Sequence, residues 1–119
     1  MNTSPEHNQR IAQMSFASVY PHYLVKIQKK GRTEAELLAL IEWLTGFTQT
    51  QIRALMEEKV NFEVFFERAT LHPNAALIKG VICGYRIEEI QNPLTRKVRY
   101  LDKLVDELAK GKPMSKILK

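Results

Sequence analysis

The 119-residue sequence contains little cysteine and no long hydrophobic run, and each shortage excludes a class of protein. A single cysteine, Cys83, can form no internal disulfide, so oxidation does not hold the fold together. No apolar run approaches the roughly 18 residues of a membrane-spanning helix, and the polar N-terminus lacks the apolar stretch of a secretory signal. We therefore expect a soluble, cytoplasmic protein that does not insert into membranes.

Metal-ligating and phosphate-binding patterns are also missing. The three histidines, His7, His22 and His72, do not pair with one another at ligand spacing on one element, whereas structural zinc needs four ligands in recognisable pairs. The segment KGVICG has neither the lysine position nor the spacing of a phosphate-binding loop. The sequence thus predicts no metal site and no cofactor.

The sequence as a whole has the composition of an ordinary globular domain. Hydrophobic residues make up 45% and charged residues 26%, which excludes general disorder. The length suits one domain. We expect a flexible N-terminal tail over residues 1–10, because the segment is polar and terminal, and a single helical domain over residues 11–119.

Two capping boxes predict helix starts in the middle of the chain. The pairs are Thr33 with Glu36 and Thr48 with Gln51. At this spacing, the side chain of each residue can accept a hydrogen bond from the backbone amide of the other. Asn61 is a further cap residue, before the short helix FEVFFERA.

Proline marks two more helix starts. Asn92 and Pro93 predict a cap followed by a first-turn proline, before the longest apolar stripe of the chain. Pro21 is interpreted in the same way, with Ser18 upstream as its cap.

For the segment VICGYRI, over residues 81–87, the sequence does not decide between a helix and a strand. The segment is rich in β-branched and aromatic residues, but no other strand is predicted to pair with it. We favour a helix interrupted near Gly84, with Gly80 and Gly84 on one face. The fold class is then all-α: a compact, orthogonal single-domain bundle of five or six helices. The predicted core includes Leu37, Ile41, Trp43, Leu44, Ile52, Leu55, Phe62, Phe65, Phe66, Leu77, Val98, Leu101, Leu104 and Leu108.

Five stretches resemble one bacterial family. They are MSFASVYPHY, KGRT, WLTGF, LIKGVICGYRIEEIQNPL and YLDKLVDELAKGKPMSKIL, and they run from about Arg10 to the last residue. In this order they resemble the small bacterial proteins grouped as domain of unknown function 2200. The resemblance implies a bacterial cytosolic origin and a compact, mainly helical domain. It implies no activity, ligand or catalytic residue.

The stretch MSFASVYPHYL concentrates polar groups that could form a small-molecule or enzymatic pocket: Ser18, Tyr20, His22 and Tyr23. A serine nucleophile needs a base and a third group that orients the base. Ser18 and His22 are four positions apart, but no orienting acid lies nearby. We interpret the stretch mainly as a helix start and predict no catalytic residue.

Basic residues gather at the two ends of the chain. The net charge is +4 over residues 1–32, −4 over 33–93 and +5 over 94–119. Either the ends fold against the acidic middle, or they form a surface for nucleic acid. The residues that would bind nucleic acid are Arg96, Lys97, Arg99, Lys103, Lys26, Lys29, Lys30 and Arg32. The sequence does not decide whether these clusters form one patch.

The function predicted first is a non-enzymatic protein-interaction or self-association module, because no catalytic set is visible. A nucleic-acid-binding protein that uses the basic C-terminal helix is the alternative, and the Tyr20–Tyr23 pocket is the second alternative.

Overall fold

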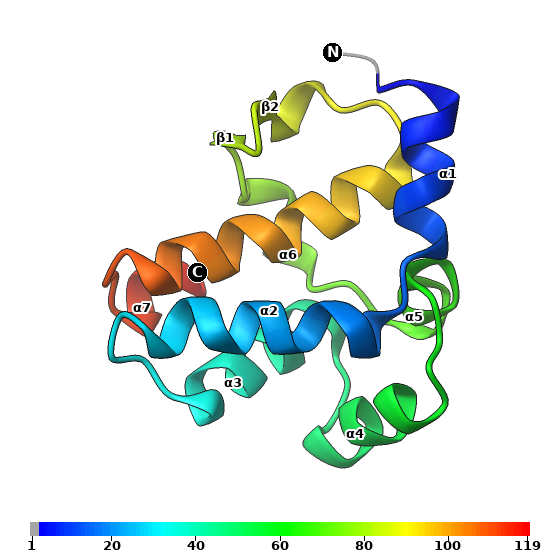
Figure 1. The fold of residues 1–119 in the computed structure, drawn as a ribbon. Coiled ribbons are helices and arrows are strands. Elements are labelled where there is room, and N and C mark those ends of the chain that lie inside the picture. Colours follow the sequence, from blue (N-terminus) through cyan, green and yellow to red (C-terminus); the bar gives the residue numbers. More distant parts are fainter. Residues whose placement is uncertain (1–2) are drawn as a thin grey trace.

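Seven α-helices form most of residues 3–119, the part of the chain that the computed structural model describes (Figure 1). The all-α prediction is confirmed. The α-helices are α1 (Pro5–Gln13), α2 (Phe16–Gln28), α3 (Glu34–Thr45), α4 (Gln49–Glu57), α5 (Phe62–Arg68), α6 (Pro93–Ala109) and α7 (Met114–Ile117). Between α5 and α6 lie two 3-10 helices, η1 (Pro73–Leu77) and η2 (Ile87–Glu89), and two short strands, β1 (Val81–Ile82) and β2 (Tyr85–Arg86).

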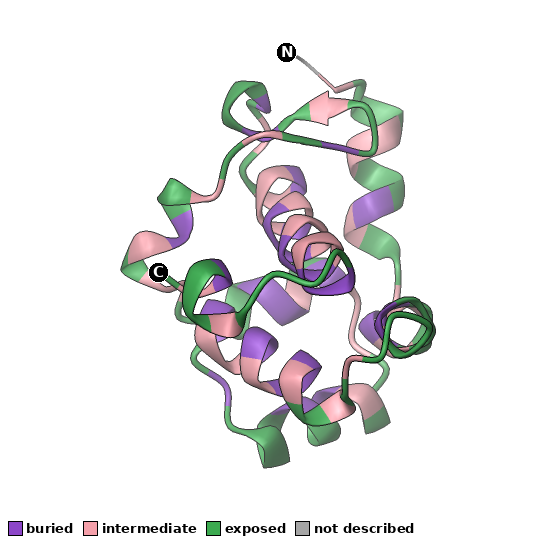
Figure 2. Cartoon of the chain, turned by 90° about the vertical axis from the view of Figure 1, so that its left-hand side faces the viewer, coloured by how far each residue is buried: buried purple, intermediate pink, exposed green. Residues whose placement is uncertain are grey.

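Helix α6 forms the centre of the fold. It lies beside α2 and runs in the same direction, while α1 crosses it at its N-terminal end (Figure 1). In Figure 2, which looks along α6, the other elements surround it and its inward faces are buried. The apolar stripe predicted for this helix explains its place, since Val98, Leu101, Leu104 and Leu108 are all buried.

The predicted capping interactions are present. The Thr33 hydroxyl accepts from the backbone amide of Glu36, and the Glu36 carboxylate accepts from that of Thr33. Thr48 and Gln51 form the second capping box. The side chains of Asn61 and Asn92 also accept from the amides three residues ahead. Each pair satisfies backbone donors that have no partner inside the helix, so these starts are set locally.

Helix α1 includes residues 5–10 of the segment that we expected to be a tail. The Ser4 hydroxyl accepts from the amide of His7 at 3.1 Å, and Pro5 is the first helical residue, the arrangement that favours a helix start. Tertiary contact completes it, because Ile11 is buried in the core. Met1 and Asn2 lie outside the described residues.

Helix α2 begins five residues earlier than predicted, so Pro21 lies inside it. A backbone bridge between Ser15 and Asn61 fixes this start: the amide of Phe16 donates to Val60 O at 3.0 Å. Ser18 is not the cap, since its hydroxyl donates to Ser15 O at 2.8 Å. Proline inside a helix removes one backbone hydrogen bond and so favours a helix that starts at Pro21. The contact between the Phe16 amide and Val60 O outweighs this preference.

Residues 81–87 form a hairpin followed by the start of η2, which corrects the predicted helix. Strands β1 and β2 pair antiparallel, with Ile82 opposite Tyr85. Cys83 and Gly84 form the two-residue turn with φ of 52° and 80°, the positive values that tight hairpins require. The strand has a partner after all, because the partner follows two residues later in the same segment.

Most of the predicted core is buried, including every predicted leucine except Leu77. Leu77, which was predicted to be in the core, is instead 59% exposed at the end of η1, so this prediction was wrong. Trp43 is only partly buried and stacks on His72, with ring centroids 4.2 Å apart. The predicted core omits four residues of α2 that the structure buries, namely Phe16, Tyr20, Tyr23 and Ile27.

Candidate ligand-binding site

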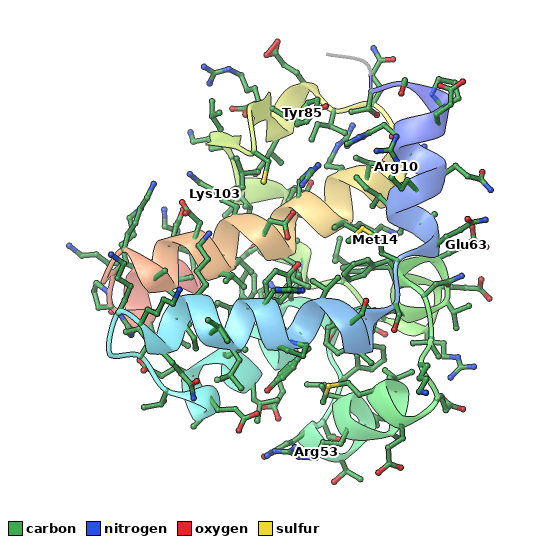
Figure 3. All side chains as sticks on the ribbon, viewed as in Figure 1. Arg10, Met14, Arg53, Glu63, Tyr85 and Lys103 are labelled. Carbon is green, nitrogen blue, oxygen red and sulfur yellow. The ribbon has the colours of Figure 1, made fainter. Side chains whose placement is uncertain are left out.

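A hollow between α1, α2 and α6 has a volume of about 250 Å³, and we call it the α1–α6 pocket. Its polar lining consists of His7, Arg10, Tyr23, Arg99 and Asp102. Its apolar lining consists of Ile11, Met14, Val19, Phe62 and Val98. Figure 3 shows Arg10 on the side of α1 that faces α6, and Met14 where α1 gives way to α2.

Asp102 is the centre of the polar network in the pocket. One carboxylate oxygen accepts from the Tyr23 hydroxyl at 2.6 Å, and the other accepts from Arg99 Nη1 at 2.9 Å. The side chains of Asp102 and Arg99 are only 16% and 12% exposed. An ion pair this well shielded is held in place more strongly than a surface pair, because little water competes for it.

The guanidinium of Arg99 is enclosed by two rings. Its central carbon lies 5.4 Å from the centroid of Tyr85, and Nη2 lies 3.3 Å from Nε2 of His7. Since arginine can only donate, Nε2 of His7 must be the acceptor and carry no proton. Nε of Arg99 is buried and has no hydrogen-bond partner among the described residues.

Burial and charge shift the pKa values of two groups in the pocket. Desolvation, followed by the charges of Arg99 and Arg10, lowers the pKa of His7 below its ordinary value. Burial, followed by the charge of Asp102, raises the pKa of Tyr23 well above its ordinary value. Near neutral pH the imidazole and the phenol are therefore both uncharged.

The α1–α6 pocket carries a net positive charge of one near neutral pH. Two arginines face one aspartate, and the histidine and tyrosine are neutral. Arg10, which is exposed, takes part in no ion pair among residues 3–119. Together with the apolar wall, this arrangement suits a small molecule with an anionic group and an apolar body.

Only one of the four predicted pocket residues belongs to this site. Tyr23 lines it, whereas the Tyr20 hydroxyl donates to Glu34 Oε2 on α3 at 2.8 Å. Ser18 and His22 are exposed on another face of α2. The four side chains therefore do not converge on one cavity.

The predicted basic residues fall into two groups at opposite ends of α6. Arg96 and Arg99 lie in its first turns, where Arg96 Nε donates to Ile90 O at 2.7 Å. Lys26 pairs with Asp106 at 3.3 Å, near the other end of α6. Arg32 lies at that same end and donates to the backbone oxygen of Lys112. The two clusters do not form one patch.

The remaining predicted cations make fewer contacts within the protein. Lys103 Nζ donates to Val81 O at 3.3 Å. Lys29 and Lys30 are exposed at the end of α2, and Lys97 is partly exposed.

Sequence reasoning missed His7, Arg10 and Asp102 as site residues. The first two fall in or beside the predicted tail, and Asp102 was assigned to no site. A signal was present, because Ser4 and Pro5 repeat the cap-and-proline pattern that correctly predicted the start of α6 at Asn92 and Pro93.

Three other features of the described residues concern metal sites, membrane-spanning helices and further hollows. No group of three or more histidine, cysteine, aspartate or glutamate side chains within residues 3–119 could hold a metal ion. No helix of the described chain is both long and apolar enough to cross a membrane. A second hollow beside Trp43 has a volume of about 210 Å³, and the one ion pair on its wall joins Glu107 to the exposed Lys112.

The fold and site thus define a small all-α domain with a charged pocket between three helices. The family model of domain of unknown function 2200, described as an uncharacterised protein conserved in bacteria, matches residues 10–119, and the chain belongs to this family. The crystal structure of uncharacterised protein SP1917 is similar. It shares 40% sequence identity, with a TM-score of 0.86 over 92% of this chain and 91% of that one. No curated protein matches the sequence.

Proposed function

We propose that this protein binds a small molecule with an anionic group in the α1–α6 pocket. The observation that carries the proposal is the state of Arg99. It is almost fully buried, it faces a pocket, and its Nε makes no hydrogen bond among the described residues. A buried donor without a partner costs free energy, typically about 1–3 kcal/mol, and native structures rarely keep one without a role. Because Nε itself is buried, an acceptor atom of a ligand would satisfy it once the Arg99 side chain turns toward the pocket.

The test is a ligand screen with a structural readout. Isotope-labelled protein is mixed with a library of small acids, amines and neutral compounds, and backbone amide signals are followed by NMR. We expect acids to shift the signals of His7, Arg10 and Arg99 in preference to those of α4. A library in which no acid moves pocket signals would contradict the proposal.

A pair of matched variants assigns binding to the pocket. Met14 lines the rim and is 41% exposed, so Met14→Trp fills the pocket without removing a buried polar group. Val25 is 51% exposed on α2 and does not line the pocket, so Val25→Trp is the control. Only the first variant should abolish binding.

Protein interaction or self-association is the second candidate function. The observation that favours it is the pair of exposed apolar side chains on η1 and β1, Leu77 at 59% and Val81 at 50% exposure. Sedimentation velocity over a range of concentrations tests self-association, with the double variant Leu77→Ser and Val81→Thr as control. A wild-type protein that is monomeric at all concentrations and has no protein partner would contradict this candidate.

Nucleic-acid binding stays a prediction with less support, because Arg96, Arg99 and Arg32 already contact groups within the chain. Anisotropy of labelled DNA and RNA at two salt concentrations tests it, since phosphate contacts weaken as salt rises. Replacing Lys29, Lys30 and Lys97 by alanine removes cations that have no ion pair among the described residues, and unchanged binding would exclude them.

A further inference from the structure

We infer that the ligand of the α1–α6 pocket is a small monocarboxylate with an apolar body, anchored by Arg10. The inference rests on the proposed function and names the class of ligand. Three properties of the pocket lead to it: its charge, the origin of its donors and its size.

The charge of the pocket favours a single negative charge on the ligand. The positive charge of Arg99 is already balanced by Asp102 at 2.9 Å. Arg10 is the remaining cation of the lining, in the last turn of α1. A second negative charge on the ligand would face the carboxylate of Asp102 without a further cation to offset it.

The donors that face the pocket suit a carboxylate better than a phosphate. Proteins often bind phosphate at helix N-termini, where several free backbone amides point at the anion. Here the lining residues of α1, α2 and α6 begin at His7, Val19 and Val98. His7 and Val19 lie in the first turns of their helices, but their amides already donate to Ser4 Oγ and Ser15 O. The donors are thus side chains. A guanidinium pairs bidentately with a carboxylate or with a phosphate, so the preference for a carboxylate rests on the lack of free amides in the lining and on Arg10, the single cation of the lining without an ion pair among the described residues.

The size and the wall of the pocket set the body of the ligand. A volume of about 250 Å³ lies below the roughly 300–1,000 Å³ of pockets for drug-sized molecules. The apolar lining includes Met14 and Phe62, and both suit contact with a flat or branched apolar group. A short branched acid or a single aromatic acid fits this description.

The experiment compares probes that differ in charge but share a body. Benzoate, benzamide and phenyl phosphate are titrated into the wild-type protein, with isovalerate as an aliphatic carboxylate, and affinities are read from the NMR shifts of pocket amides. We expect one of the two carboxylates to bind at least about tenfold more tightly than benzamide and than phenyl phosphate, the effect of one charge-assisted contact.

Two arginine variants locate the anchor. Arg10 is exposed and has no ion pair among residues 3–119, so Arg10→Gln should fold normally and weaken carboxylate binding about tenfold while leaving benzamide unchanged. Arg53 is exposed on α4 and does not line the pocket. Arg53→Gln therefore controls for the loss of one positive charge and should bind carboxylates as the wild type does.

The outcomes separate this inference from the proposed function. Tighter binding of phenyl phosphate at pocket signals would overturn the carboxylate class and leave the proposed function intact, whereas tighter binding of benzamide would overturn both. Equal loss in Arg10→Gln and Arg53→Gln would overturn Arg10 as the anchor. If neither carboxylate binds and the library screen finds only acids of another class, such as phosphates or sulfonates, at the pocket signals, the inference fails alone. If no acid of any kind moves the pocket signals, both fail.

Discussion

The hydroxyl of Tyr23 donates a 2.6 Å hydrogen bond to Asp102, a residue 79 positions later in the chain. This bond joins α2 to α6 where they pass side by side (Figure 1). It also holds the carboxylate that balances Arg99. The same contact therefore contributes to the packing of the central helices and to the charge of the candidate site.

Replacing Tyr23 by phenylalanine should lower the free energy of unfolding by about 1–2 kcal/mol. Burial of the ring is kept, and a hydrogen bond to a charged acceptor is lost. Urea unfolding of the two proteins measures the difference. A variant as stable as the wild type would mean that the hydroxyl contributes nothing net.

Replacing Asp102 by asparagine should cost more, about 3 kcal/mol, because it leaves the buried Arg99 without its counter-ion. Asp106 offers a matched control on the same helix. Its side chain is also 16% exposed, but its partners Lys26 and Lys110 are 47% and 67% exposed. Asp106→Asn should therefore cost less than about 1 kcal/mol. If urea unfolding shows equal losses of stability in the two variants, burial of the Arg99–Asp102 ion pair does not add to its contribution.

Mild acid should destabilise the protein through His7. The folded protein lowers the pKa of His7 below its ordinary 6.5, so the unfolded chain takes up a proton first as the pH falls. The stability that neutral His7 contributes is complete above 6.5 and declines as the pH falls from there toward the lowered pKa. Urea unfolding at about pH 7.5 and about pH 5.5 should show a smaller loss for His7→Gln than for wild type. Parallel losses would contradict this assignment.

Strong alkali should destabilise the protein through Tyr23. The folded protein raises the pKa of Tyr23 above its ordinary 10.0, so the unfolded chain releases its proton first as the pH rises. This contribution is complete below 10.0 and declines as the pH rises from there. Thermal unfolding across this range should decline less steeply in Tyr23→Phe than in wild type. An equally steep decline would assign the alkaline loss to other groups.

The hairpin turn can be made more stable. Cys83 is exposed and holds a φ of 52°, a region that asparagine tolerates better than cysteine. Cys83→Asn should raise the free energy of unfolding by about 0.5–1 kcal/mol, whereas Gly84→Ala, at a φ of 80°, should lower it by about 1 kcal/mol. Unfolding curves that rank the three proteins otherwise would contradict this account of the turn.

The candidate site was largely hidden in the sequence because its members come from separate elements. His7 and Arg10 lie on α1, Tyr23 on α2, and Arg99 and Asp102 on α6. Tyr23 and Arg99 were recognised as functional candidates, but for two different sites. No spacing rule links residues that are brought together by the crossing of helices, so their union could not be predicted.

The sequence by itself determined the helix starts at Thr33, Thr48, Asn61 and Asn92, because a cap and its amide lie within three residues of each other. It also determined the apolar stripe that makes α6 the central helix. Only the tertiary structure decided that α2 begins at Phe16, with Pro21 inside it, because the backbone of Val60 anchors that start from a distant segment. Packing likewise decided that Tyr23, Arg99 and Asp102 meet, since contacts between distant segments form only when the apolar faces of the helices are buried together.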